Sequence, residues 1–505
     1  MTRDAEHAGG RNAALDMDAE TFRELGHGLV DRIADFYAGL GRRRVTPGES
    51  AEQVRQVLGQ RELPARAAPP DKVLARAAEL VIEHSLHNGS PRFFGYITSS
   101  AAPLGALGDL LAAAVNPNCG GWQLSPMATE IECQAIGWIA ELIGYAPGAG
   151  GIMVSGGNMA NIVAFFAARK SRCDWDIRAA GLGDAGLGLR VYCSRETHTW
   201  VQKAADLSGL GTDAIRWIDC DTSQRMRVGH LRELVHKDRK AGLRPFLVVA
   251  AAGTVSTGAI DPLGEVGRFC RDEDIWFHVD GAYGAPAAVL PELAADFDGL
   301  AEADSVALDP HKWLYSPLEA ACTLVREPRH LTDAFSFSPV YYQFDEGEGW
   351  EGQNFYEYGM QNSRGFRALK VWLALAQVGR DGYANMIRDD IALARRIFEA
   401  ADAHAELEAV TCGLSIATFR FVPATLDAAA PGASDYLDQL NQALVIALQR
   451  GGEVFLSNAV LGGNYLLRAC IVNFRTSGAD CDALTATVVA AGRRLDSELR
   501  PAALA

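Results

Sequence analysis

The sequence predicts an α/β protein with a largely parallel sheet, followed by a separate, smaller α+β domain. Between about residues 130 and 326, short β-rich runs alternate with helical runs, an order typical of strands joined by helices. Several of the β-rich runs are almost entirely apolar, as expected of strands covered on both faces. Beyond Lys370 the pattern changes to long helical runs and a few further strands, which indicates a second domain.

The N-terminal part of the chain is predicted to be mostly helical. Residues 1 to about 15 are polar and are expected to form a loose tail. Residues 21–40 place apolar side chains at steps of three and four, which predicts a helix with one apolar face, and residues 73–84 form a second helical run. These first ~90 residues hold too little apolar material for a core of their own.

Six strands are predicted for the large sheet, and the later part of the chain mixes strands with helices. The six strands cover residues 151–154, 189–193, 246–250, 275–279, 304–308 and 322–325. Further strands are expected at 414–421 and 465–474, with a helix near 436–450. We therefore divide the chain into an N-terminal helical segment (1–95), a large α/β domain (96–375) and a small α+β domain (376–505).

Composition and charge narrow the class of partner. The 505 residues are 49% hydrophobic, and 47 Lys and Arg against 63 Asp and Glu give a net charge of −16 without a basic block. This argues against nucleic acid or an anionic membrane surface and favours a small molecule. The ten cysteines show no C-x-x-C pair and no zinc spacing, so we expect a reduced, cytoplasmic protein without a metal site. No apolar run approaches the ~20 residues of a membrane span, and no export signal is predicted.

A glycine pair follows the first predicted strand and precedes a helical run. In Ser155-Gly156-Gly157-Asn158, glycine lets the backbone approach a ligand, while the N–H groups and dipole of the helix start attract an anion such as phosphate. A plain turn would have the same sequence. The glycine pair indicates a ligand site only if other polar groups lie with it at the carboxyl ends of the strands, where open α/β sheets bind ligands.

Two further polar side chains follow predicted strands. Asp280 comes after strand 275–279, where a carboxylate is largely desolvated and needs a cationic partner or hydrogen-bond donors. It can be a helix cap or a structural ion pair, or it can anchor a protonated ring nitrogen. His198 comes after strand 189–193 and can be a hydrogen-bonded structural residue, or its flat ring can stack on a planar cofactor.

Lys312 lies in the stretch ALDPHKWLYSP, directly after a buried strand. Burial favours the neutral amine of a lysine, which can form a Schiff base with a carbonyl such as that of pyridoxal phosphate (PLP). The same sequence would also fit a lysine whose apolar chain is buried while its charged amine stays in water. A phosphate loop, a stacking histidine, a carboxylate and a lysine, each after a strand and in that order, nevertheless form one coherent cofactor site.

With these motifs, the chain resembles the group II PLP-dependent amino-acid decarboxylases and is most similar to their aromatic-L-amino-acid decarboxylase branch. The resemblance extends from about Phe22 into the C-terminal domain, and its most specific segments are HVDGAYGA and DPHKW. It implies the PLP-dependent transferase fold type I, which is aspartate-aminotransferase-like. It also implies a homodimer with active sites at the subunit interface, in which the helix 21–40 wraps around the partner subunit.

The resemblance implies roles for the residues around the cofactor ring. Lys312 carries PLP as a Schiff base, and Asp280 pairs with the pyridine nitrogen. Ala282 lies against the ring, and His198 stacks over it. These four residues follow three of the predicted strands.

The same resemblance implies how the rest of the cofactor is held. Gly157 and Asn158 hold the phosphate with help from His311. Thr254, in the segment AAGTVSTGAIDP, lies near the cofactor.

Two segments bear on the product and the substrate. In this family a loop tyrosine in a Pro-x-Tyr setting, here Tyr341, protonates the substrate Cα after carbon dioxide leaves, whereas relatives with phenylalanine there tend to form aldehydes. Members that act on aromatic substrates often have an aromatic residue after the tyrosine of FFGYITSS. Here Ile97 and Thr98 follow Tyr96, so this wall of the substrate pocket differs.

The expected reaction is decarboxylation of an L-amino acid, aromatic by the resemblance, to an amine and carbon dioxide. The alternatives are oxidative decarboxylation with deamination to an aldehyde, and decarboxylation of a non-aromatic amino acid. A Rossmann oxidoreductase would share the α/β pattern, but no G-x-G-x-x-G follows the first strand. An inactive scaffold is disfavoured because every reactive group is present.

Overall fold

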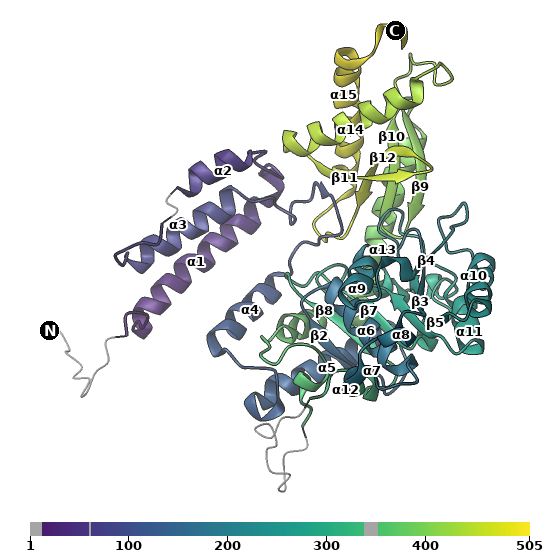
Figure 1. Ribbon diagram of the computed structural model, residues 1–505. Coiled ribbons are helices and arrows are strands. Elements are labelled where there is room, and N and C mark those ends of the chain that lie inside the picture. Colours follow the sequence, from purple (N-terminus) through teal and green to yellow (C-terminus); the bar gives the residue numbers. More distant parts are fainter. Residues whose placement is uncertain (1–12, 60–61, 338–351, 505) are drawn as a thin grey trace, which may run out of the picture.

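The chain forms a large sheet covered by helices, a smaller sheet beyond it and a helical arm at its N-terminal end (Figure 1). The computed structural model describes residues 13–59, 62–337 and 352–504. The helices are α1 (Ala19–Gly39), α2 (Ala51–Leu58), α3 (Pro70–Glu83), α4 (Pro103–Val115), α5 (Pro126–Leu142), α6 (Gly157–Arg172), α7 (Ile177–Ala180), α8 (Gly183–Gly186), α9 (Trp200–Leu207), α10 (Val228–Lys240), α11 (Leu263–Asp272), α12 (Arg329–Phe335), α13 (Ala368–Asp402), α14 (Ala433–Gly451) and α15 (Gly478–Leu499). The strands are β1 (Phe93–Phe94), β2 (Gly150–Val154), β3 (Leu189–Ser194), β4 (Ile215–Ile218), β5 (Arg244–Ala251), β6 (Trp276–Asp280), β7 (Ser305–Leu308), β8 (Ala321–Val325), β9 (Leu407–Gly413), β10 (Ile416–Phe421), β11 (Phe455–Leu461) and β12 (Asn464–Cys470).

The large sheet has seven strands in the order β2-β8-β7-β6-β5-β3-β4. Strands β4, β3, β5, β6 and β7 pair in parallel, and β8 lies antiparallel between β7 and β2. Strand β2 therefore runs in the same direction as the parallel strands, and its carboxyl end lies at the same edge of the sheet. The six predicted strands and the mainly parallel α/β class are confirmed, whereas the edge strand β4 was not predicted.

Helix α6 carries the glycine pair to this edge. It packs across β5, β7 and β8, and its buried face consists mostly of small and apolar residues. The strands beneath it are buried along their whole length in β6, β7 and β8, which explains their continuous apolar sequence. The start of α6 is thereby fixed beside the ends of the central strands.

The smaller sheet has five strands in the order β1-β11-β12-β10-β9. The strands expected at 414–421 and 465–474 and the helix near 436–450 correspond to β10, β12 and α14, although β12 ends at Cys470 and not at 474. The short strand β1 pairs in parallel with β11, so the N-terminal segment contributes to the C-terminal sheet. Helix α13 leads into this unit and has non-helical angles at Gly379 (φ 66°, ψ 172°), near the predicted boundary between 375 and 376. The domain boundaries themselves stay a prediction.

The N-terminal arm consists of α1, α2 and α3, which lie to one side of both sheets (Figure 1). The helices expected at 21–40 and 73–84 are confirmed as α1 and α3, and Asp18 caps α1 by accepting the N–H of Thr21 at 2.8 Å. No residue of α1 is buried, and Phe22 on its apolar face is 58% exposed. Within the described residues, no helix is long and apolar enough to cross a membrane.

Candidate active site

A pocket lies at the carboxyl edge of the large sheet, where most of the predicted cofactor residues converge. Its volume is about 130 Å³. Strands β3, β5, β6 and β7 all end at this edge, and α6 begins there. The predicted residues that line the pocket are Gly157, Asn158, His198, Thr254, Asp280, Ala282 and Lys312.

The start of α6 has the properties of an anion site. Gly156, which precedes the helix, has a φ of 131° that favours glycine, and no side chain caps this helix start. A Cβ on Gly157 would lie 2.5 Å from Asp309 Oδ2, so only glycine lets the helix start approach so closely. The first N–H groups of a helix have no partner within the helix, and the dipole there is positive. A phosphate group fits this position.

Asp280 presents a firmly held carboxylate to the pocket. It is the last residue of β6 and is 8% exposed. Its Oδ2 accepts the indole N–H of Trp200 at 2.7 Å, and its Oδ1 accepts the backbone N–H of Ala282 at 3.2 Å. Both donors are neutral, so the negative charge is left for a cation in the pocket, such as a protonated ring nitrogen.

His198 lines the pocket with an exposed, flat ring. Its Nδ1 accepts the backbone N–H of Trp200 at 3.3 Å. Desolvation by the surrounding protein lowers the pKa of His198, although the nearby Asp280 opposes this shift. The neutral ring that results carries its proton on Nε2, because Nδ1 is an acceptor. A flat, exposed ring of this kind is suited to stacking on a flat molecule.

Lys312 reaches the pocket from the turn after β7. Its Nζ lies 3.0 Å from Asp309 Oδ2, and its side chain is 20% exposed, compared with 2% for Asp309. The other carboxylate oxygen of Asp309, Oδ1, is buried and has no hydrogen-bond partner among the described residues. The amine is thus held beside the helix start, with a carboxylate that has hydrogen-bonding capacity to spare.

The turn that carries Lys312 is fixed by aromatic side chains. Trp313 stacks on Tyr283 with ring centroids 4.9 Å apart and an interplanar angle of 18°. The indole N–H of Trp313 and the hydroxyl of Tyr315 both donate to Asp390 Oδ2, at 2.9 and 2.7 Å. Asp390 belongs to α13, so this helix anchors the turn that carries Lys312.

Some predicted site residues lie outside the pocket lining. His311 is beside it: its Nδ1 is 2.6 Å from the carbonyl oxygen of Ala320, and its Nε2 is 3.7 Å from Asp309 Oδ2. The segment of Tyr96, Ile97 and Thr98 passes close by, because the next residue donates its hydroxyl to the His311 carbonyl at 2.8 Å.

These positions do not test the roles expected from the sequence. Tyr96 is 54% exposed and lies against Phe455, with ring centroids 5.9 Å apart, while Ile97 packs on the large core. The roles of Tyr96, Ile97 and Thr98 in substrate binding and of His311 in phosphate binding stay predictions. Tyr341 lies outside the described residues.

Several pocket residues were not singled out from the sequence. They include Asn161, Glu196, Trp200, Tyr283 and Asp309. Asn161 follows Gly157 by four residues on α6 and donates to its carbonyl oxygen at 2.8 Å, a spacing that could have indicated it. Trp200 stands two residues after His198, but nothing in the sequence links it to Asp280.

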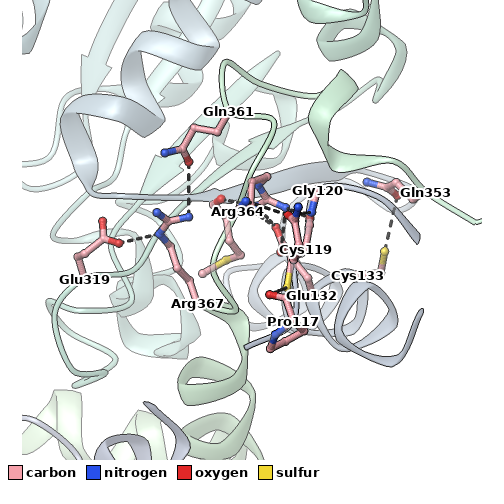
Figure 2. Close-up of polar contacts among 12 residues, drawn as sticks. Pro117, Cys119, Gly120, Glu132, Cys133, Glu319, Gln353, Gln361, Arg364 and Arg367 are labelled. Carbon is pink, nitrogen blue, oxygen red and sulfur yellow. Dashed lines mark hydrogen bonds and ion pairs between the residues drawn. The ribbon is translucent and has the colours of Figure 1, made fainter. Parts of the chain in front are cut away.

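A buried ion pair supports the strand that leads into the glycine loop (Figure 2). Arg364 and Glu132 are 1% and 0% exposed, and their Nη2 and Oε1 atoms are 2.5 Å apart. Glu132 Oε1 also accepts the backbone N–H of Met153 at 3.0 Å, and Arg364 Nη2 donates to the Met153 carbonyl at 2.7 Å. Arg364 Nη1 donates to the Cys119 carbonyl at 2.8 Å. The pair thus ties β2 to α5 and to the segment around Cys119.

The pocket fits PLP on the chemistry of its side chains. The uncapped start of α6 suits the phosphate, and the Asp280 carboxylate suits a protonated ring nitrogen. The His198 ring suits the flat face, and the Lys312 amine suits the aldehyde carbon. The mainly parallel sheet and this pocket define a PLP-dependent enzyme of fold type I.

Comparison with known proteins gives the family. A profile described as "Pyridoxal-dependent decarboxylase conserved domain" matches residues 52–422, and the chain belongs to this family of decarboxylases. The chain is 33% identical over 465 residues to an aromatic-L-amino-acid decarboxylase of Bacillus atrophaeus, covering 92% of this chain and 94% of the relative. It is 30% identical over 464 residues to a phenylacetaldehyde synthase of Arabidopsis thaliana, covering 90% and 92%.

A solved structure agrees with this assignment. The crystal structure of Oryza sativa TDC with PLP and tryptamine matches with a TM-score of 0.87 and 28% identity, covering 96% of this chain and 99% of that chain. The expected fold type I and the expected cofactor are confirmed. The protein is a PLP-dependent amino-acid decarboxylase.

Proposed function

We propose that the protein converts an aromatic L-amino acid to the corresponding amine and carbon dioxide, with PLP attached to Lys312. The observation that carries the proposal is the convergence of Lys312, Asp280 and the uncapped start of α6 on one pocket. Aromatic substrates are supported by the similarity to an aromatic-L-amino-acid decarboxylase. Bound PLP supplies an electron sink for the electron pair left on Cα when carbon dioxide departs.

Four groups of the pocket have defined tasks in this proposal. Lys312 Nζ attaches the cofactor, and Asp280 holds the proton on the ring nitrogen, because a carboxylate fixed by two neutral donors stabilises a cation. The backbone N–H groups at the start of α6 bind the phosphate. The ring of His198 covers the cofactor face and excludes water from it.

The last task is the transfer of a proton to Cα, which we assign to Tyr341. The support is its Pro-x-Tyr setting, to which the resemblance to the decarboxylase family assigns the protonation of Cα. Oxidative formation of an aldehyde is the second candidate function, because a phenylacetaldehyde synthase is among the relatives. A general acid at Tyr341 favours the amine, since it protonates Cα before oxygen reacts.

We further propose that the protein is a homodimer, located in the cytoplasm. The helices α1, α3 and α4 line an apolar groove of about 1,200 Å³, and α1 has no buried residue of its own. Apolar faces of this size mark an interface, and a second copy of the arm would cover it. The mass of the full-length protein in solution, measured by light scattering, tests this proposal: a monomer at micromolar concentration would contradict the dimer.

The proposed location in the cytoplasm has a separate support. Free thiols at the ten cysteines are compatible with a reducing compartment.

The reaction is tested by a substrate screen. The purified protein with added PLP is incubated with each common L-amino acid, and amines, aldehydes and carbon dioxide are measured together by mass spectrometry. We expect tryptophan, tyrosine, phenylalanine or a close derivative to give equal amounts of amine and carbon dioxide. Turnover confined to acidic or aliphatic amino acids would overturn the aromatic assignment, and aldehyde as the main product would replace the decarboxylase with an aldehyde synthase.

A further inference from the structure

Trp200 makes two hydrogen bonds that reach two different groups of the pocket. Its indole N–H donates to Asp280 Oδ2 at 2.7 Å, and its backbone N–H donates to His198 Nδ1 at 3.3 Å. Trp200 is itself fully buried and lines the pocket. One residue therefore sets the position of both the carboxylate and the imidazole.

The position of the indole is fixed from its other side. Its ring meets the ring of His278 edge to face, with centroids 5.8 Å apart and an interplanar angle of 86°. His278 is held in turn by Ser305 Oγ at 2.8 Å and Asn161 Oδ1 at 2.7 Å. Burial lowers the pKa of His278 to about 4, so this support stays neutral at physiological pH.

The hydrogen bonds in this support have a single consistent direction. The Asn161 side-chain N–H donates to the Gly157 carbonyl, so Asn161 Oδ1 is an acceptor and His278 Nε2 must donate to it. The Nδ1 of the neutral ring is then an acceptor, and Ser305 donates to it. Such a fully satisfied network holds its members in one arrangement, and it places the Trp200 indole firmly against Asp280.

We propose that Trp200 is a positioning residue that holds the Asp280 carboxylate and the His198 ring where they contact the cofactor. The proposal rests on the proposed function, in which Asp280 and His198 bind PLP. Without the indole N–H, Asp280 Oδ2 loses its short hydrogen bond. Among the residues that the structure describes, only the longer backbone bond on Oδ1 then restrains the carboxylate. A carboxylate free to rotate meets the ring nitrogen less often in the correct orientation.

The substitution Trp200→Phe isolates the indole N–H. It keeps an apolar aromatic ring against His278, and it keeps the backbone N–H that reaches His198. The full-length protein, freed of cofactor, is titrated with PLP, and binding is followed by absorbance. We expect the Kd for PLP to rise about tenfold, the effect typical of losing one hydrogen bond to a charged group.

Tyr145→Phe is the matched control. Tyr145 is also buried in the large core, and its hydroxyl donates to the Ala303 carbonyl at 2.8 Å, a hydrogen bond that involves neither Asp280 nor the residues that hold His278. This variant should lose thermal stability to a similar extent while its Kd for PLP stays within about twofold of wild type. An equal rise of Kd in both variants would mean that Trp200 has only a structural role, and would overturn the proposal.

Two further variants show whether Trp200 acts through Asp280. Asp280→Ala alone should raise the Kd for PLP. In this background Trp200→Phe should not raise it further, because the acceptor of the hydrogen bond is gone. Trp200→His keeps an N–H at the matching position of a smaller ring and should bind PLP more tightly than Trp200→Phe. A tenfold effect that persists in the Asp280→Ala background, or His no better than Phe, would refute the proposal.

Binding of PLP to the wild type separates a wrong role for Trp200 from a wrong function of the protein. If the wild type does not bind PLP, the proposed function is wrong and the inference falls with it. If the wild type binds PLP and Trp200→Phe binds it equally well, only the role of Trp200 is wrong.

Discussion

Replacing Arg364 by methionine is expected to destabilise the protein strongly and in a pH-dependent way. Glu132 is 0% exposed and has three short contacts: two to Arg364, at 2.5 and 3.2 Å, and one to the N–H of Met153, at 3.0 Å. In Arg364→Met only the last contact remains, while the apolar part of the side chain is largely preserved. The variant therefore keeps a buried carboxylate without its cation.

The size of the effect follows from this arrangement. Removing one partner of a buried ion pair costs about 3–5 kcal/mol, because the other charge is left uncompensated. In the variant, burial should raise the pKa of Glu132 above its value of about 4.3 in the unfolded chain. The contribution of Glu132 protonation to the variant's stability is then fully present below about pH 4.3 and is lost as pH rises through the raised pKa, by about 1.4 kcal/mol per pH unit between the two values. The loss of the Arg364 hydrogen bonds to the Cys119 and Met153 carbonyls is the same at every pH. The total loss of stability should be smaller at about pH 5 than at about pH 8.

The assay compares half-denaturation temperatures of wild type and variants at these two pH values. Arg364→Met should melt well below wild type at the higher pH and closer to it at the lower pH. The double variant Glu132→Gln with Arg364→Met has no buried charge, so it should recover part of the loss and most of the difference between the two pH values. An equal loss at both pH values, or no loss at all, would refute this account of the pair.

Three other substitutions give separate tests. Asp280→Asn should still bind PLP but lose on the order of 10²–10³ in kcat for carbon dioxide release, because an amide cannot hold the ring-nitrogen proton; near-normal turnover would move that role elsewhere. Burial raises the pKa of Asp390 to about 7, so its contribution to wild-type stability is fully present below about pH 4 and lost as pH rises to about 7. Asp390→Asn should therefore melt progressively higher relative to wild type over that range, and a constant difference would show that Asp390 does not titrate there. Tyr341→Phe should shift the product in air from amine towards aldehyde and ammonia, and an unchanged ratio measured by mass spectrometry would remove Tyr341 from the mechanism.

The sequence predicted those parts of the fold that depend on local patterns. Strands such as β5 and β6 are buried apolar runs, and α1 and α3 show a clear helical period. Strand β4 was not predicted because its four residues, IRWI, have buried ends and half-buried polar and aromatic residues between them. The pairing of β1 with β11 joins residues far apart in the chain, and no local pattern specifies such a contact.

In the site, too, local patterns predicted some residues and could not predict the contacts between distant parts of the chain. His198, Asp280 and Lys312 could be predicted because each follows a strand, and parallel strands bring their carboxyl ends together. The contacts that hold these residues were not predictable in this way. The Trp200 indole reaches Asp280 across 80 positions of sequence, and Arg364 reaches Glu132 across 232, so only the folded chain reveals either pair.

The attachment of the cofactor to Lys312 can be measured directly. Borohydride reduction of the protein with bound PLP fixes the cofactor irreversibly to the amine that binds it, and peptide mapping by mass spectrometry then locates the pyridoxyl group. We predict a single modified peptide that contains Asp309-Pro310-His311-Lys312-Trp313, and none in Lys312→Ala. A pyridoxyl group on another lysine, such as Lys203, whose charge also acts on His198, would contradict the account.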